Sequence, residues 1–257
     1  TLSGGDGIDT ITANAGIDSV TGGAGNDILI FGANLTADDT VDGGAGTDSL
    51  RVSVVSASAM TGVTNVENLQ VTSAATVSLA SDLSFDSIDL KTSTSSESVT
   101  FTTGYLKATT VSVEGGDSVT NTGADIVLTV SADSDDLAAA DNTMLTGSDK
   151  TGVINTLTVT NTTGTIDMAS TGDIGGFDVL NIVDHSSTTG NDVTVNLTSY
   201  ASALTIDAST LDSGEVLTIS GASAKALNVT GGAGADVLAL GVGADTIDGG
   251  AGNDTFT

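Results

Sequence analysis

The chain has 257 residues, 39 % of them hydrophobic, which is enough to bury a core. It contains no Pro, Cys or Trp, and only 3 % of its residues are aromatic, so we expect a thin core of Val, Ile, Leu and Ala without disulfide staples. Its formal net charge of −28 argues against nucleic acid as a partner and calls for bound divalent cations. No apolar run approaches the roughly 18 residues of a membrane span.

A nine-residue pattern occurs near both ends: two Gly, a spacer, Gly, a spacer, Asp, and an apolar residue between two spacers. Its five clean copies begin at Gly4, Gly22, Gly43, Gly231 and Gly249. Their position-six residues are Asp9, Asp27, Asp48, Asp236 and Asp254. Degenerate copies keep Asp18, Asp39 and Asp245. The shared nine-residue frame indicates a structural repeat rather than a chance cluster of Gly.

Each copy is interpreted as one turn followed by one short strand. Gly at positions one, two and four permits positive φ and close backbone approach, so six residues form a tight turn whose carbonyl groups point into one concavity. The last three residues form a strand with the apolar residue inward, and two units complete a coil of about 18 residues. The frame slips after Ile30, and we interpret residues 31–33 as a small bulge or loop.

The position-six Asp residues have two interpretations. Asp and Gly dominate ordinary β-turns, so these residues could be turn formers alone. The regular period favours ion binding, because stacked carboxylates would repel each other without cations. Ion binding and folding would then be one event.

These repeats resemble the nonapeptide repeats of the RTX family, over roughly residues 1–51 and 231–257. In that family calcium lies between two stacked turns, held by turn carbonyl groups and by position-six Asp side chains. The resemblance therefore implies calcium as the cofactor and a β-roll at each end. It also implies secretion in an unfolded state through a one-step (type I) channel, with folding triggered by calcium outside the cell.

The resemblance also implies which residues hold the metal. Asp9 would share an ion with Asp27, and Asp236 with Asp254. The other candidates are Asp18, which would face Asp39 across the shifted frame, and Asp48 and Asp245. Asp48 and Asp245 match the motif without a clean stacking partner, so we expect half-sites there or sites completed elsewhere. The turns that contribute to these sites begin at Gly4, Gly22, Gly43, Gly231 and Gly249.

The middle segment, residues 52–230, keeps apolar residues in alternating pairs roughly every 10 or 11 residues, such as Leu69/Val71, Val99/Phe101 and Leu180/Ile182. We predict an all-β fold: one parallel β-roll or β-solenoid with calcium-binding turns at both ends and Ser/Thr-rich coils of about 22 residues between them. An antiparallel β-sandwich inserted between two β-rolls stays open, since alternation does not fix strand direction. Residues 133–140 could form a short helix. The chain is interpreted as a window of a longer protein.

Catalytic motifs are absent from the sequence. Its one His, His185, follows Asp184, but adjacent strand residues face opposite sides, so we predict no enzyme activity. RTX rolls also accompany secreted enzymes and toxins, so a non-catalytic region of such a protein, or of an adhesin, is the alternative.

Two middle segments, 63–71 and 176–182, resemble stretches between the repeats of RTX-bearing surface-layer proteins of Gram-negative bacteria. This second resemblance favours a structural protein of an extracellular assembly, above all a surface (S-) layer, secreted to the cell surface. We expect self-assembly with identical copies, with cell-surface polysaccharide as a second candidate partner, and neither nucleic acid nor a membrane span.

Overall fold

The computed structural model is divided by internal contacts into two compact units, which are described separately. Unit 1 comprises Thr1–Val113 and Asp117–Val127, and unit 2 comprises Glu114–Gly116 and Leu128–Thr257. The structure describes residues 1–53, 57–72, 76–79, 83–90, 96–102, 105, 107–114, 117–122, 127–133, 137, 144–147, 154–161, 164–168, 174–184, 190–198, 200–221 and 225–257. The domain boundaries expected at residues 51 and 230 stay a prediction.

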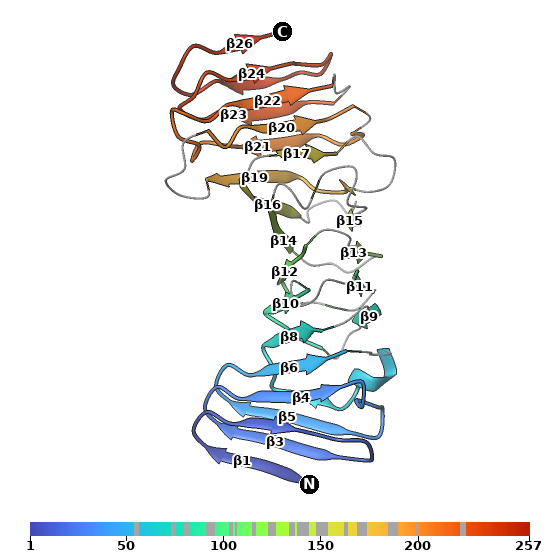
Figure 1. The fold of residues 1–257 in the computed structure, drawn as a ribbon. Helices are drawn as coiled ribbons and strands as arrows, with labels where there is room; N and C mark the ends of the chain where they lie inside the picture. The colour runs from blue at the N-terminus through green and yellow to red at the C-terminus, as the bar shows by residue number, and fades with distance from the viewer. Residues whose placement is uncertain are drawn as a thin grey trace. The chain divides into compact units, whose positions relative to one another are not determined.

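Unit 1 contains three runs of hydrogen-bonded strands. The first run is β1 (Leu2–Asp6), β3 (Ser19–Ala24), β5 (Thr40–Ala45) and β7 (Val63–Thr64). The second is β2 (Thr10–Thr12), β4 (Ile28–Gly32), β6 (Ser49–Val52), β8 (Asn68–Val71), β10 (Ser87–Asp89) and β12 (Thr109–Ser112). The third is β9 (Thr76–Leu79), β11 (Ser98–Phe101) and β13 (Ser118–Asn121). Figure 1 shows β1, β3 and β5 as successive rungs.

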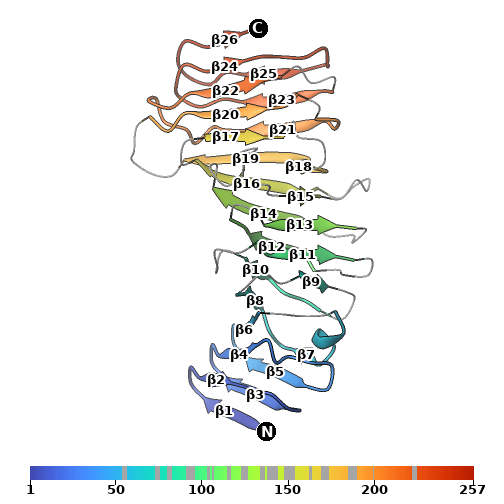
Figure 2. The ribbon, with the colours of Figure 1, turned by 45° about the vertical axis from the view of Figure 1, so that its right-hand side comes forward.

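Unit 2 is built in the same way. One run is β14 (Leu128–Asp133), β16 (Thr156–Asn161), β19 (Val179–Asp184), β21 (Leu204–Asp207), β23 (Leu227–Thr230) and β25 (Thr246–Asp248). The facing run is β17 (Gly164–Asp167), β20 (Val193–Asn196), β22 (Leu217–Ser220), β24 (Val237–Leu238) and β26 (Thr255–Phe256). A short pair is β15 (Met144–Thr146) with β18 (Ile174–Gly175). Figure 2 shows β22 and β24 stacked as rungs beside β23 and β25.

Strand direction settles the fold class. Every strand pair in the part of the chain that the structure describes is parallel, in the glycine-rich ends and in the middle alike. The predicted all-β parallel β-solenoid is therefore confirmed, and the alternative of an inserted antiparallel sandwich is wrong. Parallel neighbours arise because each strand pairs with the equivalent strand one coil later.

Coil length varies more than expected. Leu2 pairs with Val20 and Val237 with Thr255, so coils at both ends have the predicted 18 residues. Gly164 pairs with Val193, which is 29 residues later and exceeds the expected 22. Strands β17 and β20 nevertheless pair in parallel from Gly164↔Val193 to Asp167↔Asn196.

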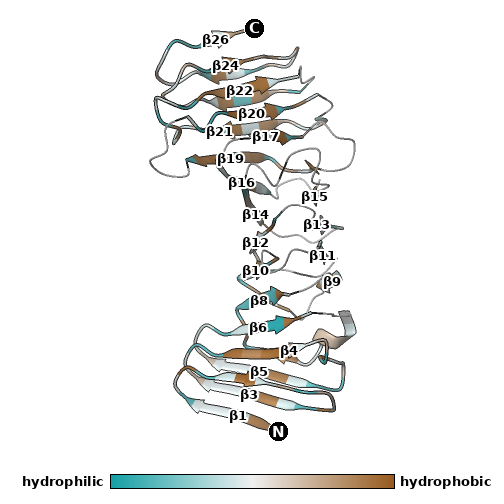
Figure 3. Ribbon diagram, viewed as in Figure 1, coloured by the Kyte–Doolittle hydropathy of each residue, from teal (hydrophilic) through white to brown (hydrophobic). Residues whose placement is uncertain are grey.

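The core of unit 1 contains a continuous row of apolar side chains on the second run of strands. Its fully buried members pair in register from coil to coil and are Leu29, Leu50, Leu69, Ile88 and Val111. Neighbours in each strand are less buried, as alternation requires. Figure 3 shows the apolar character of β4.

Aromatic rings contribute more to the core than composition indicated. Phe31, Phe85, Phe101 and Phe177 are buried, as are both Tyr side chains. The hydroxyl of Tyr105 accepts a hydrogen bond from the Phe85 N–H at 3.1 Å and lies 2.8 Å from the Thr109 hydroxyl. The core is therefore thin and aliphatic with rings at intervals, and the polar end of Tyr105 is satisfied inside it.

Local irregularities were predicted with mixed success. The register between β4 and β6 shifts between Ile30 and Gly32, and Gly32 has φ of 53°, so the expected bulge is confirmed. Of the helix expected at residues 133–140, Asp133 instead ends β14, Leu137 is buried and has 3-10 helical structure, and the others lie outside the described residues. The helix η1 (Ala57–Met60) was not predicted. Among the described residues no helix could span a membrane.

Truncation of the buried row should lower stability strongly. We expect Leu50→Ala to reduce the free energy of unfolding by about 2–5 kcal/mol, because it removes a fully buried side chain between Leu29 and Leu69. Urea unfolding followed by circular dichroism at saturating calcium measures this change. Ile17→Ala, at a side chain that is 77 % exposed, is the control and should stay within about 0.5 kcal/mol of the parent protein. Equal losses would contradict the assigned core.

Candidate metal centre

A column of acidic residues runs along one edge of unit 1, each directly before a strand of the second run. We call it the carboxylate column; its members are Asp9, Asp27, Asp48, Glu67 and Asp86. The Asp9 N–H donates to Asp27 Oδ1 at 2.8 Å, and the Asp27 N–H donates to Asp48 Oδ1 at 2.7 Å. The Asp48 N–H donates to Glu67 Oε2 at 2.8 Å. One oxygen of each accepting carboxylate is thereby fixed against the preceding coil.

The second oxygen of the aspartates has a different environment. Oδ2 of Asp9, Asp27 and Asp48 is buried and accepts no hydrogen bond from any residue that the structure describes. The Asp27 and Asp48 side chains are 1 % and 0 % exposed. A buried carboxylate oxygen without a donor is costly, so these atoms indicate a positively charged ligand.

Backbone carbonyl groups lie beside these oxygens because the turns begin with Gly. A Cβ added at Gly22 would meet both Asp27 Oδ2 and the carbonyl oxygen of Gly43 in the next coil. The same pair of neighbours, Asp236 Oδ2 and the Gly249 carbonyl, surrounds Gly231. Carboxylate and carbonyl oxygens gathered at one point are the donor set that calcium prefers, so the residues present fit this ion.

Asp18 and Asp39 lie together at the opposite edge of unit 1, where hydrogen bonds from the protein stabilise the charge of Asp39. The Asp18 N–H donates to Asp39 Oδ1 at 2.7 Å, while Asp39 Oδ2 accepts from the N–H and hydroxyl of Thr36 at 2.7 and 2.9 Å. Burial acts to raise the pKa of Asp39, but these hydrogen bonds outweigh it and the pKa is lowered. Protein donors stabilise this carboxylate, in a turn that lacks the glycines of the clean repeats.

The C-terminal turns place Asp236 next to Asp254. The Asp236 N–H donates to Asp254 Oδ1 at 3.1 Å. Asp236 is fully buried and accepts from the N–H groups of Leu217 at 2.8 Å and Gly232 at 2.9 Å. Burial raises the pKa of Asp236, and the charge of Asp254 raises it further. Asp245 contacts the preceding coil, where it accepts from the Leu227 N–H at 2.9 Å.

Two features of the column were missed from the sequence. Asp48 was expected to lack a clean stacking partner, yet it lies between Asp27 and Glu67, so that expectation is wrong. Glu67 and Asp86 continue the column at intervals of 19 residues, each before an alternating apolar strand, and that spacing was the available signal. Lys107 Nζ lies 2.8 Å from Asp86 Oδ1, so a fixed cation pairs with this last member.

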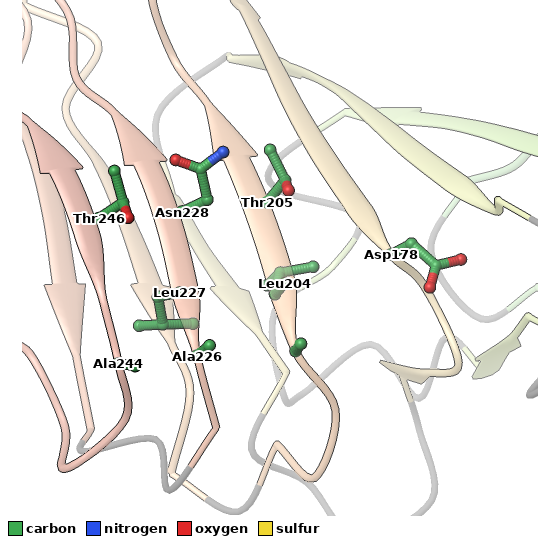
Figure 4. Close-up of a pocket in the computed structure, with 9 residues that line it drawn as sticks. Asp178, Leu204, Thr205, Ala226, Leu227, Asn228, Ala244 and Thr246 are labelled. Atoms are coloured by element: carbon green, nitrogen blue, oxygen red, sulfur yellow. The ribbon is translucent and has the colours of Figure 1, made fainter.

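Catalytic chemistry has little support among the described residues. They contain no group of three or more His, Cys, Asp or Glu side chains that could hold a metal by side chains alone, as a catalytic metal centre would, and His185 lies outside them. A groove of about 530 Å³ lies over β21, β23 and β25 (Figure 4). Asp178 is the one carboxylate among its described lining residues, and it accepts a hydrogen bond from the Asn155 N–H at 2.9 Å. The groove therefore lacks a convergent acid–base pair.

Stacked parallel coils whose glycine turns gather carboxylate and carbonyl oxygens define a cation-binding β-roll. The family model of the RTX calcium-binding nonapeptide repeat matches the chain in 4 copies, at residues 3–34, 36–51 and 228–256. The chain thus carries RTX repeats, which bind calcium, form a non-catalytic structural region and are typical of secreted proteins. The predicted RTX resemblance and the calcium cofactor are confirmed. No curated protein and no solved structure matches the chain.

A side chain at the first glycine of a turn should weaken calcium binding. We expect Gly22→Ala to raise the calcium concentration needed for folding by on the order of tenfold, because its Cβ occupies the space between Asp27 Oδ2 and the Gly43 carbonyl. Calcium titration followed by circular dichroism measures the midpoint. Gly175→Ala is the control, since its Cβ would meet nothing within 4 Å. An unchanged midpoint for Gly22→Ala would place the ion elsewhere.

The raised carboxyl pKa values predict how pH acts on the calcium-free protein. Burial raises the pKa of Asp48 above 3.8, and the charges of Asp27, Glu67 and Asp42 add to this effect. A carboxyl group whose pKa is higher in the folded state than in the unfolded state stabilises the fold at pH values below the unfolded-state pKa. This contribution is lost as pH rises through the folded-state pKa. The sheet content of the calcium-depleted protein, followed by circular dichroism, should therefore decrease with a measurable slope as pH rises above about 4. Asp48→Asn should reduce that slope, and an unchanged slope would contradict the assignment.

Proposed function

We propose that the chain is a calcium-dependent structural protein of an extracellular bacterial assembly, in particular a surface layer. The observation that carries the proposal is the series of buried carboxylate oxygens on successive coils, at Asp9, Asp27 and Asp48, that have no hydrogen-bond donor in the part of the chain that the structure describes. Ions held between coils stiffen a stack, because each ion links two turns that otherwise repel each other. Stiffness along a repetitive stack suits a building element.

The surface of the turns supports contact between copies. Ile8 and Ile17, each at position five of a turn, are 78 % and 77 % exposed, and Val242 is 90 % exposed. Large apolar side chains at turn tips are unfavourable in water and gain from burial against another molecule. We therefore assign the turn tips of identical copies as the contact regions of the assembly.

The groove in Figure 4 is the candidate surface for polysaccharide. Thr205, Asn228 and Thr246 lie in register on neighbouring strands and line it. Hydroxyl and amide groups in a row suit hydrogen bonding to sugar hydroxyls. This partner would anchor the assembly to a cell surface, while export and calcium-triggered folding would follow the route implied by the RTX repeats.

The alternative is a non-catalytic RTX region of a secreted enzyme, toxin or adhesin. Such a region requires calcium for folding but not self-assembly. The two proposals therefore differ in the size of the particle that calcium produces.

Calcium should produce both sheet structure and large particles. We expect the chelated protein to be small and poor in sheet by circular dichroism and light scattering, and millimolar calcium to yield ordered arrays in electron micrographs. Ile17→Ser should reduce array formation without altering the calcium-induced circular dichroism, because Ile17 is exposed. The control is Asp38→Asn, at another exposed turn residue. A calcium-loaded protein that stays monomeric would favour the alternative, and full folding without calcium would contradict both.

A further inference from the structure

Two carboxylates of unit 2 lie outside the RTX repeats and share an unusual environment. Glu215 is 1 % exposed; its Oε2 accepts from the Asp212 N–H at 2.9 Å, whereas its Oε1 is buried without a hydrogen-bond donor among the described residues. Asp184, the last residue of β19, has a buried Oδ1 in the same condition. His185, which follows Asp184 in the sequence, lies outside the described residues.

The two groups face each other. Burial raises the pKa of Glu215, and the charges of Asp184 and Asp212 raise it further, with Asp184 also in side-chain contact. Two ionised carboxylates have only acceptor atoms, so they cannot hydrogen-bond to each other. Either a shared proton or a bound cation is needed between the two oxygens.

The turn that carries Glu215 belongs to the same stack as the C-terminal RTX turns. The Ala233 N–H donates to the Leu211 carbonyl at 2.9 Å, and Ile219 pairs with Leu238 in the strands that follow. A Cβ on Gly234 would meet the carbonyl oxygen of Glu215. The turn therefore lies one coil before the turn of Asp236, although its residues 208–216 lack the nonapeptide pattern and precede the family match at 228.

We propose that Glu215 and Asp184 form an additional divalent-cation site, one coil before the C-terminal repeats. Its donors are hard carboxylate oxygens, with Asp212 adding negative charge nearby, and this set suits calcium better than a softer metal. A divalent ion carries two positive charges and therefore neutralises both carboxylates, whereas a single shared proton neutralises only one. The site extends the ion stack into a turn without glycine at the usual positions. It does not depend on the proposed assembly role.

Calcium stoichiometry tests the site directly. The chain is equilibrated against buffered calcium, and bound metal is measured by atomic emission for the parent protein, Glu215→Gln, Asp184→Asn and the control Asp38→Asn. Each of the two site variants should bind one calcium ion fewer per chain than the parent, and Asp38→Asn should bind the same number. Two separate variants guard against one of them failing to fold, which circular dichroism in calcium reports.

Thermal stability distinguishes an ion from a shared proton. With calcium present, Glu215→Gln should melt at a lower temperature than the parent, because the amide weakens ion binding. If the carboxylates instead share a proton, replacing one of them relieves repulsion, so the variant should melt at the same or a higher temperature. Unchanged stoichiometry together with unchanged or raised melting temperature would overturn the proposal.

In crystals with calcium, an anomalous scattering peak between Glu215 and Asp184 would support it, and the absence of such a peak would contradict it.

Discussion

Repulsion between carboxylates on successive coils is the constraint on which the rest of the structure depends. Neighbouring strands of a sheet lie about 4.8 Å apart, and like charges at that distance repel by roughly 3 kcal/mol at an effective dielectric constant of 20. Parallel stacking in register repeats this spacing at Asp9, Asp27, Asp48 and Glu67. The coils can stack closely only where this charge is neutralised.

The chain neutralises its stacked acids in more than one way. At Asp27 and Asp48 a buried oxygen has no hydrogen-bond donor among the described residues, which leaves it for calcium. At Asp39 the N–H and hydroxyl of Thr36 take the place of an ion. At Asp86 the ammonium group of Lys107 does so, in a partly exposed pair that contributes little stability by itself. Calcium therefore neutralises only some of the stacked carboxylates, and the residues next to each carboxylate determine whether an ion is needed there.

Sequence reasoning succeeded where structure is encoded locally. The glycine frame predicted that Asp9 would lie beside Asp27 and Asp236 beside Asp254, because a fixed turn length places equivalent residues one coil apart. It missed Glu67, whose turn reaches positive φ at Asn65 rather than at Gly and is shorter than the repeat. Strand direction in the middle could not be predicted, since alternation is the same in parallel and antiparallel sheets. Long-range pairing alone determines it.

The distribution of glycine explains why calcium and the apolar core complement each other. Strands β3 and β5 each contain two adjacent Gly residues, which bury no side chain, whereas β8 and β11 bury Leu, Val or Phe at alternate positions. Coils with glycine turns therefore gain less from apolar burial, and Gly also loses more chain entropy on folding. The same glycines permit the close approach of carbonyl oxygens that an ion requires. Calcium binding thus becomes available in the coils whose side chains stabilise them least.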